Sequence, residues 1–293
     1  MTAHGTNTLS LYFRGNPPAF LQRADGTFVL GGGGTDIWAT ADQFRFAYQQ
    51  LSGNGSIVAR VDSLIRADAW TKVGVMIRET LEAGSRHAAV VVTPDNGVSF
   101  LQRIAASAAS QQVNQTGLKA PYWVKLTRTG NTFAAQCSAD GVTWANITND
   151  PATSSVDVTM AANVYIGLAV TSHNAAAQTT AQFSNVATTG AVTGQWQSLA
   201  IGVAQPSNDP APLYLVVEDK AGHKVLVVHP DPGVTTTAAW QQWRVPLSDV
   251  GSAGVNLAAV KKLTIGVGDR ASPKPGAAGK LYIDDIGVGH PGL

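Results

Sequence analysis

The chain has 293 residues and a nearly balanced charge, with 20 lysines and arginines against 19 aspartates and glutamates. Charged residues make up only 13% of it, so we expect no nucleic-acid partner and no attraction to an anionic membrane surface. The single cysteine, Cys137, excludes an internal disulfide framework and every multi-cysteine metal site. No apolar run approaches the length of a membrane span, and the chain is long enough for two domains with separate cores.

Short β-branched or aromatic runs fill the first part of the chain, and glycine, asparagine, aspartate or proline residues bound them. Turn signals such as Gly53-Asn54-Gly55 and Asp140-Gly141 fall between the runs. This spacing predicts a sandwich or jelly roll rather than alternating strands and helices. One helix is arguable over 77–83, with a strand followed by a loop as the alternative. The expected strands are 56–64, 88–93, 122–129, 132–138 and 164–171.

A second set of strands follows a change in composition near Gly190. Proline-rich loops such as 230–232 separate these strands, which indicates a second and smaller β-unit. The expected strands are 213–218, 224–229, 243–246, 262–267 and 281–288.

Two stretches resemble known modules. Residues 33–187, which include GGTDIWATADQF, WTKVGVMIRETLEAGSRHAAVVVTP, SADGVTWANI and YIGLAVTSHN, resemble the concanavalin A-like (laminin G, glucanase-type) jelly-roll modules of bacterial extracellular proteins. Residues 212–288, with PLYLVVEDKAGHKVLVVHPDP, WQQWRVPLSDV and GKLYIDDIGV, resemble the galactose-binding-like β-sandwich modules of secreted carbohydrate-active enzymes. The low lysine and glutamate content resembles that of bacterial secreted β-modules, so we favour an extracellular or periplasmic protein whose export signal is not included in this sequence. The alternative is a protein that is soluble inside the cell.

The strand expected over 8–16 has no hairpin partner nearby. In the β-sandwich family that the tail resembles, an LSLYFRGN-type strand directly precedes a PLYLVVED-type strand, so we interpret the jelly roll as an insertion. The expected fold is all-β, with two antiparallel β-sandwich (jelly-roll) domains. A concanavalin A-like jelly roll of residues 19–194 is inserted into a galactose-binding-like β-sandwich of residues 8–16 plus 195–293. The alternative is that residues 1–18 are a leader.

Carboxylate chemistry has little support in the sequence, because the chain has only three glutamates. Glycosidases of the glucanase-type jelly roll resemble one another in a Glu-x-Asp-x-Glu strand, whose alternate residues point into one cleft. Glu79 and Glu82 are three apart and would point to opposite faces of a strand, and Glu218 lies in the other domain. We therefore assign no catalytic residue. An aspartate-based pair stays open, although turns, caps and surface charge are the favoured roles of Asp36, Asp42, Asp62 and Asp95.

Other reactive groups are interpreted as structural. The six histidines are scattered without metal-ligand spacing, so each is expected to be an isolated polar residue. Cys137 lies in an alternating strand pattern and is expected to be a buried thiol. The glycines 31–34 precede neither a helix nor a Gly-Lys-Ser/Thr sequence, so a flexible β-loop is favoured over a phosphate site.

Calcium is the favoured ion. In galactose-binding-like modules that end in a Tyr-Ile-Asp-Asp-type strand, an aspartate there often helps to hold a structural Ca²⁺. The resemblance therefore implies Asp284 or Asp285 as a metal ligand. The partner ligands of that family usually come from earlier strands, which this chain lacks.

Carbohydrate sites need exposed aromatic rings beside hydrogen-bonding groups, because sugar C–H faces stack on indole or phenol rings. Trp38 lies beside Asp36, and Trp70 lies among polar residues, both at expected loop or strand-edge positions. Trp240 and Trp243 are three apart, so in a strand one of them is expected in the core and the other on the surface. The candidate ligand-binding residues are Asp36, Trp38, Trp70 and Trp240.

The expected function is that of a non-catalytic carbohydrate-binding or adhesion module pair, attached to the neighbouring domains of a larger secreted protein. It would bind a neutral polysaccharide or glycan by stacking and hydrogen bonding. One alternative is a glycoside hydrolase or polysaccharide lyase with an aspartate-based site. A second alternative is a structural spacer or protein-interaction unit.

Overall fold

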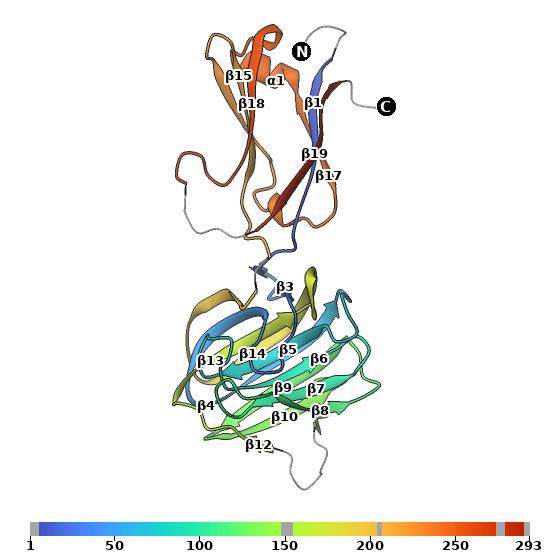
Figure 1. The fold of residues 1–293 in the computed structure, drawn as a ribbon, viewed down its shortest axis with the longest axis vertical. Coiled ribbons are helices and arrows are strands. Elements are labelled where there is room, and N and C mark those ends of the chain that lie inside the picture. Colours follow the sequence, from blue (N-terminus) through green and yellow to red (C-terminus); the bar gives the residue numbers. More distant parts are fainter. Residues whose placement is uncertain (1–5, 148–154, 204–206, 274–278, 290–293) are drawn as a thin grey trace. The chain divides into compact units, whose positions relative to one another are not determined.

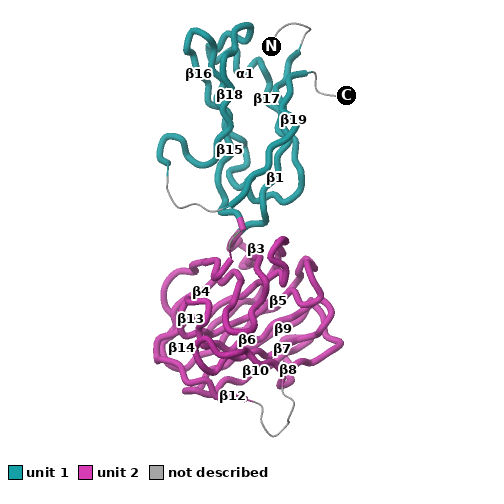
Figure 2. The backbone as a smooth tube through the Cα atoms, in the orientation of Figure 1, with its two compact units in different colours: residues 1–18, 208–293 teal, residues 19–207 magenta. Residues whose placement is uncertain are grey.

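The computed structural model describes residues 6–147, 155–203, 207–273 and 279–289 and is almost entirely β (Figure 1). The chain divides into two compact units, a larger one of residues 19–207 and a smaller one of residues 1–18 with 208–293 (Figure 2). The predicted all-β class is confirmed by one large antiparallel sheet and two three-stranded sheets. No helix in the described ranges is long and apolar enough to cross a membrane.

The large sheet folds back on itself, because the long strand β4 (Phe44–Leu64) serves two layers. Residues 45–52 of β4 pair with β13 (Asn163–Thr171), whereas residues 55–61 pair with β9 (Tyr122–Thr129). The other strands of this unit are β2 (Phe20–Gln22), β3 (Phe28–Gly34), β5 (Lys72–Arg78), β6 (His87–Val92), β7 (Val98–Arg103), β8 (Gln111–Gln115), β10 (Thr132–Ser138), β11 (Ala145–Asn146), β12 (Ser155–Asp157) and β14 (Asn174–Ile201). The main strand order is β11-β10-β9-β4-β13-β5-β6-β7-β8, and β14 pairs with β3 and β4.

One hydrophobic core lies between the two layers. Successive side chains of a strand alternate between faces, so every second residue points inward. Val75 of β5 and Leu126 of β9 are both fully buried in this core. Cys137 of β10 is buried in the same core, and burial raises the pKa of its thiol to about 11. The prediction that Cys137 is a buried thiol is confirmed.

Of the two alternatives left open for residues 77–83, the strand followed by a loop is the correct one, because β5 continues to Arg78 and no helix forms there. Two other local predictions differ from the structure. The flexible loop expected at residues 31–34 is wrong, because these glycines form the buried end of β3. A Cβ atom on Gly32 would lie 2.4 Å from the Val170 carbonyl oxygen, so only glycine fits this close approach. The composition change near Gly190 is not a boundary in the structure, since β14 runs through it and the larger unit extends to Ser207 instead of 194.

Gly167 on β13 gives a test of this tight packing. A Cβ atom there would lie 1.9 Å from the Ala47 carbonyl oxygen of β4. Gly167→Ala is therefore expected to lower the free energy of unfolding by about 1–3 kcal/mol, measured by urea denaturation. The matched control is Gly287→Ala, where a Cβ atom meets nothing within 4 Å and the expected change is below about 0.5 kcal/mol. Equal effects of the two substitutions would contradict the packing described.

The smaller unit is built from residues of both the first and the last part of the chain. Its first sheet has the order β17-β1-β19, with β1 (Thr8–Gly15) between β17 (Gln241–Pro246) and β19 (Leu281–Gly289). Its second sheet has the order β16-β15-β18, from β15 (Leu213–Asp219), β16 (Lys224–Val228) and β18 (Val260–Val267). Short helical segments are η1 (Val234–Thr236), α1 (Leu247–Ser252) and η2 (Leu257–Ala259).

The core of the smaller unit depends on β1. Leu11 and Phe13 are fully buried in one cluster with Leu215 of β15 and Trp243 of β17. Residues near the start of the chain thus pack against residues beyond position 208, and β1 belongs to the folded core of this unit.

Candidate functional site

The loop of residues 35–43 covers the middle of one face of the large sheet. Its Ile37 side chain is fully buried in a cluster with Phe46 of β4, Met76 of β5 and Ala169 of β13. The Asp42 backbone N–H donates to the Ala83 carbonyl at 3.0 Å and so ties the loop to the turn after β5. The loop is therefore packed onto this face of the sheet and tied to it by hydrogen bonding.

A buried charge cluster fastens the loop. Arg103 of β7 donates to both Asp42 carboxylate oxygens, at 2.6 and 2.9 Å, and Arg78 of β5 donates to the same carboxylate at 3.4 Å. Arg103 also donates to the carbonyls of Trp38 and Ala39 in the loop. All three charged side chains are fully buried. The predicted turn, cap or surface role of Asp42 is wrong, and its role is to neutralise two buried guanidinium groups.

His87 of β6 lies against this cluster, with Nδ1 3.6 Å from an Asp42 oxygen. Burial lowers the pKa of His87 from 6.5 to about 4, and the charges of Arg103 and Arg78 act in the same direction against the attraction of Asp42. Between these two values the unfolded chain binds a proton that the folded chain does not bind, so stability falls as pH falls through this window.

We expect proton binding at His87 in the unfolded chain to lower the free energy of unfolding by about 3 kcal/mol as the pH falls from 6.5 to 4. The measurement is urea denaturation at several pH values, for the wild type and for His87→Gln. The variant should lose less stability over this window, since glutamine does not titrate. Parallel curves for the two proteins would contradict a buried neutral His87.

A pocket of about 310 Å³ lies at the start of β5. Asp36 and Trp38 come from the covering loop, Trp70 from the segment before β5, and His173 from the turn between β13 and β14. Both indole rings are partly exposed. This is the Trp38–Trp70 pocket, lined by Asp36, Trp38, Trp70, Lys72, Gln112 and His173.

Lys72 organises the floor of this pocket. Its ammonium is buried, contacts the Asp36 carboxylate, and lies 5.5 and 5.8 Å from the ring centroids of Trp38 and Trp70. Burial lowers the pKa of Lys72, while Asp36 opposes this shift. The Asp36 carboxylate also accepts from the Ile37 backbone N–H at 2.7 Å. One buried ammonium thus fixes the carboxylate and both rings in place.

His173 lies between two carboxylates. Its Nε2 atom is 3.3 Å from Asp36 Oδ2, and its Nδ1 atom is 3.0 Å from Asp68 Oδ1. The Trp70 backbone N–H donates to Asp68 at 2.8 Å and holds the pKa of that carboxyl below its usual value. His173 has a φ of 56°, a left-handed backbone conformation that points to a constrained turn. The site thus combines two flat apolar rings with several fixed donors and acceptors.

Three of the four candidate ligand-binding residues lie together. Asp36, Trp38 and Trp70 line one pocket, whereas Trp240 lies in the smaller unit. Trp240 is 48% exposed and Trp243 is 6% exposed, as their spacing predicts. Sequence reasoning missed three lining residues: His173, which it treated as isolated, Gln112 and Lys72. No local pattern marks His173 or Gln112, because each reaches the pocket from a distant strand or turn, whereas Lys72 lies only two positions from Trp70.

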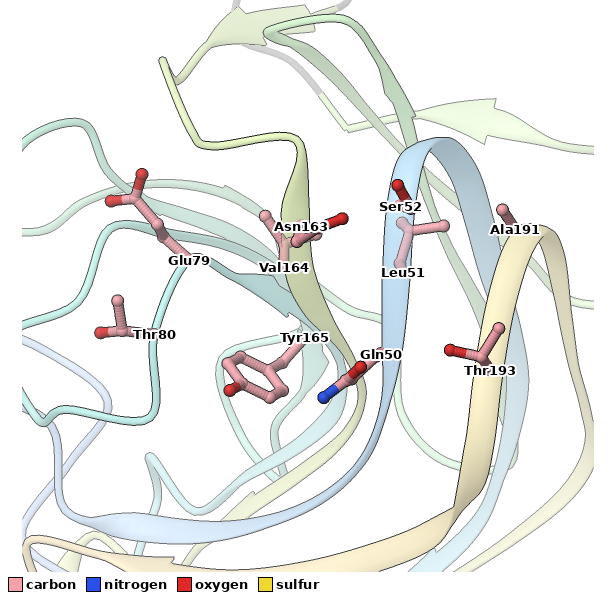
Figure 3. A pocket seen from close by; sticks show the side chains of 10 residues that line it. All are labelled: Gln50, Leu51, Ser52, Glu79, Thr80, Asn163, Val164, Tyr165, Ala191 and Thr193. Carbon is pink, nitrogen blue, oxygen red and sulfur yellow. The ribbon is translucent and has the colours of Figure 1, made fainter.

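A second pocket of about 440 Å³ includes residues beyond the other end of β5 (Figure 3). Figure 3 shows the Tyr165 ring beside the Gln50 amide, and these residues are register partners on β13 and β4. Its carboxylate, Glu79, is already engaged, at 3.1 Å by Arg86 and at 2.9 Å by the Ala161 backbone N–H. With a single aromatic ring, this pocket offers less surface for stacking than the Trp38–Trp70 pocket.

The residues expected to hold calcium lie on the last strand of the smaller unit. Asp284 and Asp285 of β19 are both exposed, and the Asp285 backbone N–H donates to the Asp284 carboxylate at 2.9 Å. Within the described ranges no three histidine, cysteine, aspartate or glutamate side chains gather as a metal site would require. The assignment of a calcium ligand to Asp284 or Asp285 stays a prediction.

No family model matches the chain, and no curated protein matches its sequence. A solved structure similar to it is a functionally unknown protein from Saccharomyces cerevisiae, 15% identical with a TM-score of 0.48, over 62% of this chain and 96% of that chain. Family 7 alginate lyase A1-II′ in complex with product is 11% identical with a TM-score of 0.39, over 64% and 95% of the two chains. The GH43 protein BlXynB from Bacillus licheniformis is 11% identical with a TM-score of 0.36, over 60% and 33%. At these identities the chemistry of the site is argued from its own residues.

Proposed function

We propose that the chain binds a neutral polysaccharide in the Trp38–Trp70 pocket and acts as a non-catalytic module of a larger secreted protein. The observation that carries this proposal is the pocket itself, where two partly exposed indole rings and four hydrogen-bonding side chains line one volume of about 310 Å³. The balanced charge of the chain favours an uncharged ligand.

A sugar ring matches this lining in two ways. Its C–H face stacks on the indole of Trp38 or Trp70, which removes apolar surface from water. Its hydroxyl groups both donate and accept, so they pair with the Gln112 amide and with the acceptor site left on Oδ2 of Asp36, a hydrogen bond that does not need a carboxyl group free to react. Because Lys72 and His173 already hold Asp36, little side-chain entropy is lost when the sugar binds.

The carboxylates of the site are engaged in ways that favour binding over catalysis. Asp36 contacts Lys72, His173 and the Ile37 N–H, and Asp68 contacts His173 and the Trp70 N–H. A nucleophile or general acid needs a carboxyl group that is free to meet the substrate. The competing function, an aspartate-based hydrolase or lyase, would need to displace these partners.

The test is retention on insoluble cellulose, xylan, mannan, chitin and β-1,3-glucan, with parallel detection of released reducing ends. We expect retention on at least one polymer without product, and about a tenfold loss of affinity in Trp70→Ala. Trp144→Ala is the matched control, because that tryptophan is also partly exposed and lies 5.5 Å from a lysine ammonium, Lys125, outside the pocket. Each assay is repeated with calcium and with a chelator.

Three results would overturn this proposal. Absence of retention on every polymer would favour a spacer or a protein-interaction unit. Equal losses of polysaccharide affinity in Trp70→Ala and Trp144→Ala would show that the binding site lies outside this pocket. Release of reducing ends that is lost in Asp36→Asn would establish an enzyme.

A further inference from the structure

The outward face of the sheet β17-β1-β19 presents aromatic and polar side chains in rows. Along β1, Leu11 and Phe13 point inward, so Tyr12 and Arg14 point outward. Strand register places Tyr12 between Gln242 of β17 and Asp284 of β19, and it places Arg14 opposite Tyr282. We call this surface the aromatic platform, formed by Tyr12, Arg14, Trp240, Gln242, Tyr282 and Asp284.

Arg14 holds the platform together. Its guanidinium lies 5.4 Å from the ring centroid of Trp240 and 4.4 Å from that of Tyr282. Its Nε atom is buried without a hydrogen-bond partner in the described part of the chain. Tyr12, Trp240 and Tyr282 nevertheless remain 37%, 48% and 39% exposed. The cation therefore aligns two rings that stay open to solvent, which a purely structural contact does not require.

We infer that the aromatic platform is a second polysaccharide-binding site, separate from the Trp38–Trp70 pocket. The ligand class of this second site rests on the proposed function, whereas the arrangement of the platform residues is independent of it. Trp240 and Tyr282 offer stacking surfaces on either side of Arg14. Arg14 and the Gln242 amide nitrogen can donate to sugar hydroxyls, and the Asp284 carboxylate can accept from them; the Gln242 Oε1 atom already accepts from Arg244 at 2.8 Å.

Charge selects an uncharged glycan as the occupant of the aromatic platform. The positive charges of Arg14 and of Arg244, which is exposed on the same face and donates to Gln242, are matched by the two exposed carboxylates of Asp284 and Asp285. A polymer of uronic acids would gain no net attraction from this balanced set of charges. A neutral polyol needs both donors and acceptors, and the platform supplies both.

The experiment is native gel electrophoresis of the full chain in gels containing soluble xyloglucan, galactomannan or mixed-linkage β-glucan, with polygalacturonate as the acidic probe. Measurements are made in the Trp70→Ala background, which weakens the pocket about tenfold and so makes the platform the stronger site in the gel. We expect at least one neutral polymer to retard this protein. We expect Trp240→Ala and Tyr282→Ala each to weaken the interaction about tenfold, and Tyr282→Phe to preserve it. Leu226→Ala is the matched control, because Leu226 of β16 is also 48% exposed and lies on the other sheet.

The inference is overturned if Trp240→Ala and Tyr282→Ala migrate like Leu226→Ala. It is also overturned if no neutral polymer retards the Trp70→Ala protein, or if polygalacturonate alone does so. These failures are distinct from failure of the pocket. If Trp70→Ala abolishes all binding, the pocket is supported as the binding site and the platform is overturned. If Trp70→Ala changes nothing and Trp240→Ala abolishes binding, the platform is supported and the pocket is overturned.

Discussion

Replacing Asp42 with alanine is expected to lower the stability of the larger unit by about 3–5 kcal/mol. The Asp42 carboxylate is fully buried and is the acidic partner of both Arg78 and Arg103. Its removal leaves two guanidinium charges in a low-dielectric interior without compensation, and water cannot reach them. Urea denaturation followed by tryptophan fluorescence measures the change.

The matched control is Asp95→Ala. Asp95 also pairs with an arginine, Arg66 at 2.8 Å, but both side chains are largely exposed. Loss of that pair is expected to cost about 0–1 kcal/mol. Similar costs for the two substitutions would contradict the interpretation that the charge cluster fastens loop 35–43 to the sheet. Because Arg103 also holds the Trp38 carbonyl, Asp42→Ala should weaken polysaccharide retention as well.

Phe13→Ala is expected to lower the stability of the smaller unit by about 3–5 kcal/mol. Phe13 is fully buried in the cluster that also contains Leu215 and Trp243, and its ring meets the His229 ring edge-on with centroids 5.7 Å apart. A cavity at this position would remove the packing contacts of β1 with Leu215 of β15 and Trp243 of β17. Hydrogen exchange of peptides from β15 and β17 measures the loss of protection.

Tyr12→Ala is the control for Phe13→Ala, because Tyr12 is the neighbouring residue on β1 and points outward. Its effect on stability is expected to be below about 1 kcal/mol. If Phe13→Ala left β15 and β17 fully protected, residues 1–18 would be a leader without a structural role. The proposal that the jelly roll is inserted into a second module would then fail.

Local patterns in the sequence were sufficient to predict the all-β class and several residues of the candidate site. The alternation of apolar residues predicts strands at 122–129 and 132–138, and β9 and β10 occupy these ranges. The requirement for aromatic rings beside polar groups selected Trp38, Asp36 and Trp70, which share one pocket. Such features are visible because neighbours in the sequence determine them.

Features that depend on distant contacts could not be predicted in the same way. Asp42 resembles a surface aspartate in the sequence, because its partners Arg78 and Arg103 lie 36 and 61 positions away. His173 has no local signal, since its contacts with Asp36 and Asp68 arise only when β13 reaches the start of β5. The glycines of β3 resemble a flexible loop until the close approach of Val170 is known.

The most direct test of polysaccharide binding in the Trp38–Trp70 pocket is a hydrogen-exchange footprint with an oligosaccharide of the retained polymer. We expect slower exchange in the larger unit within residues 35–43 and 66–73 and around His173, because these segments carry the rings and the polar groups of the pocket. The Trp70→Ala variant should show no such protection. Protection confined instead to the segments around Gln50 and Tyr165, which line the pocket of Figure 3, would contradict the assignment of the site.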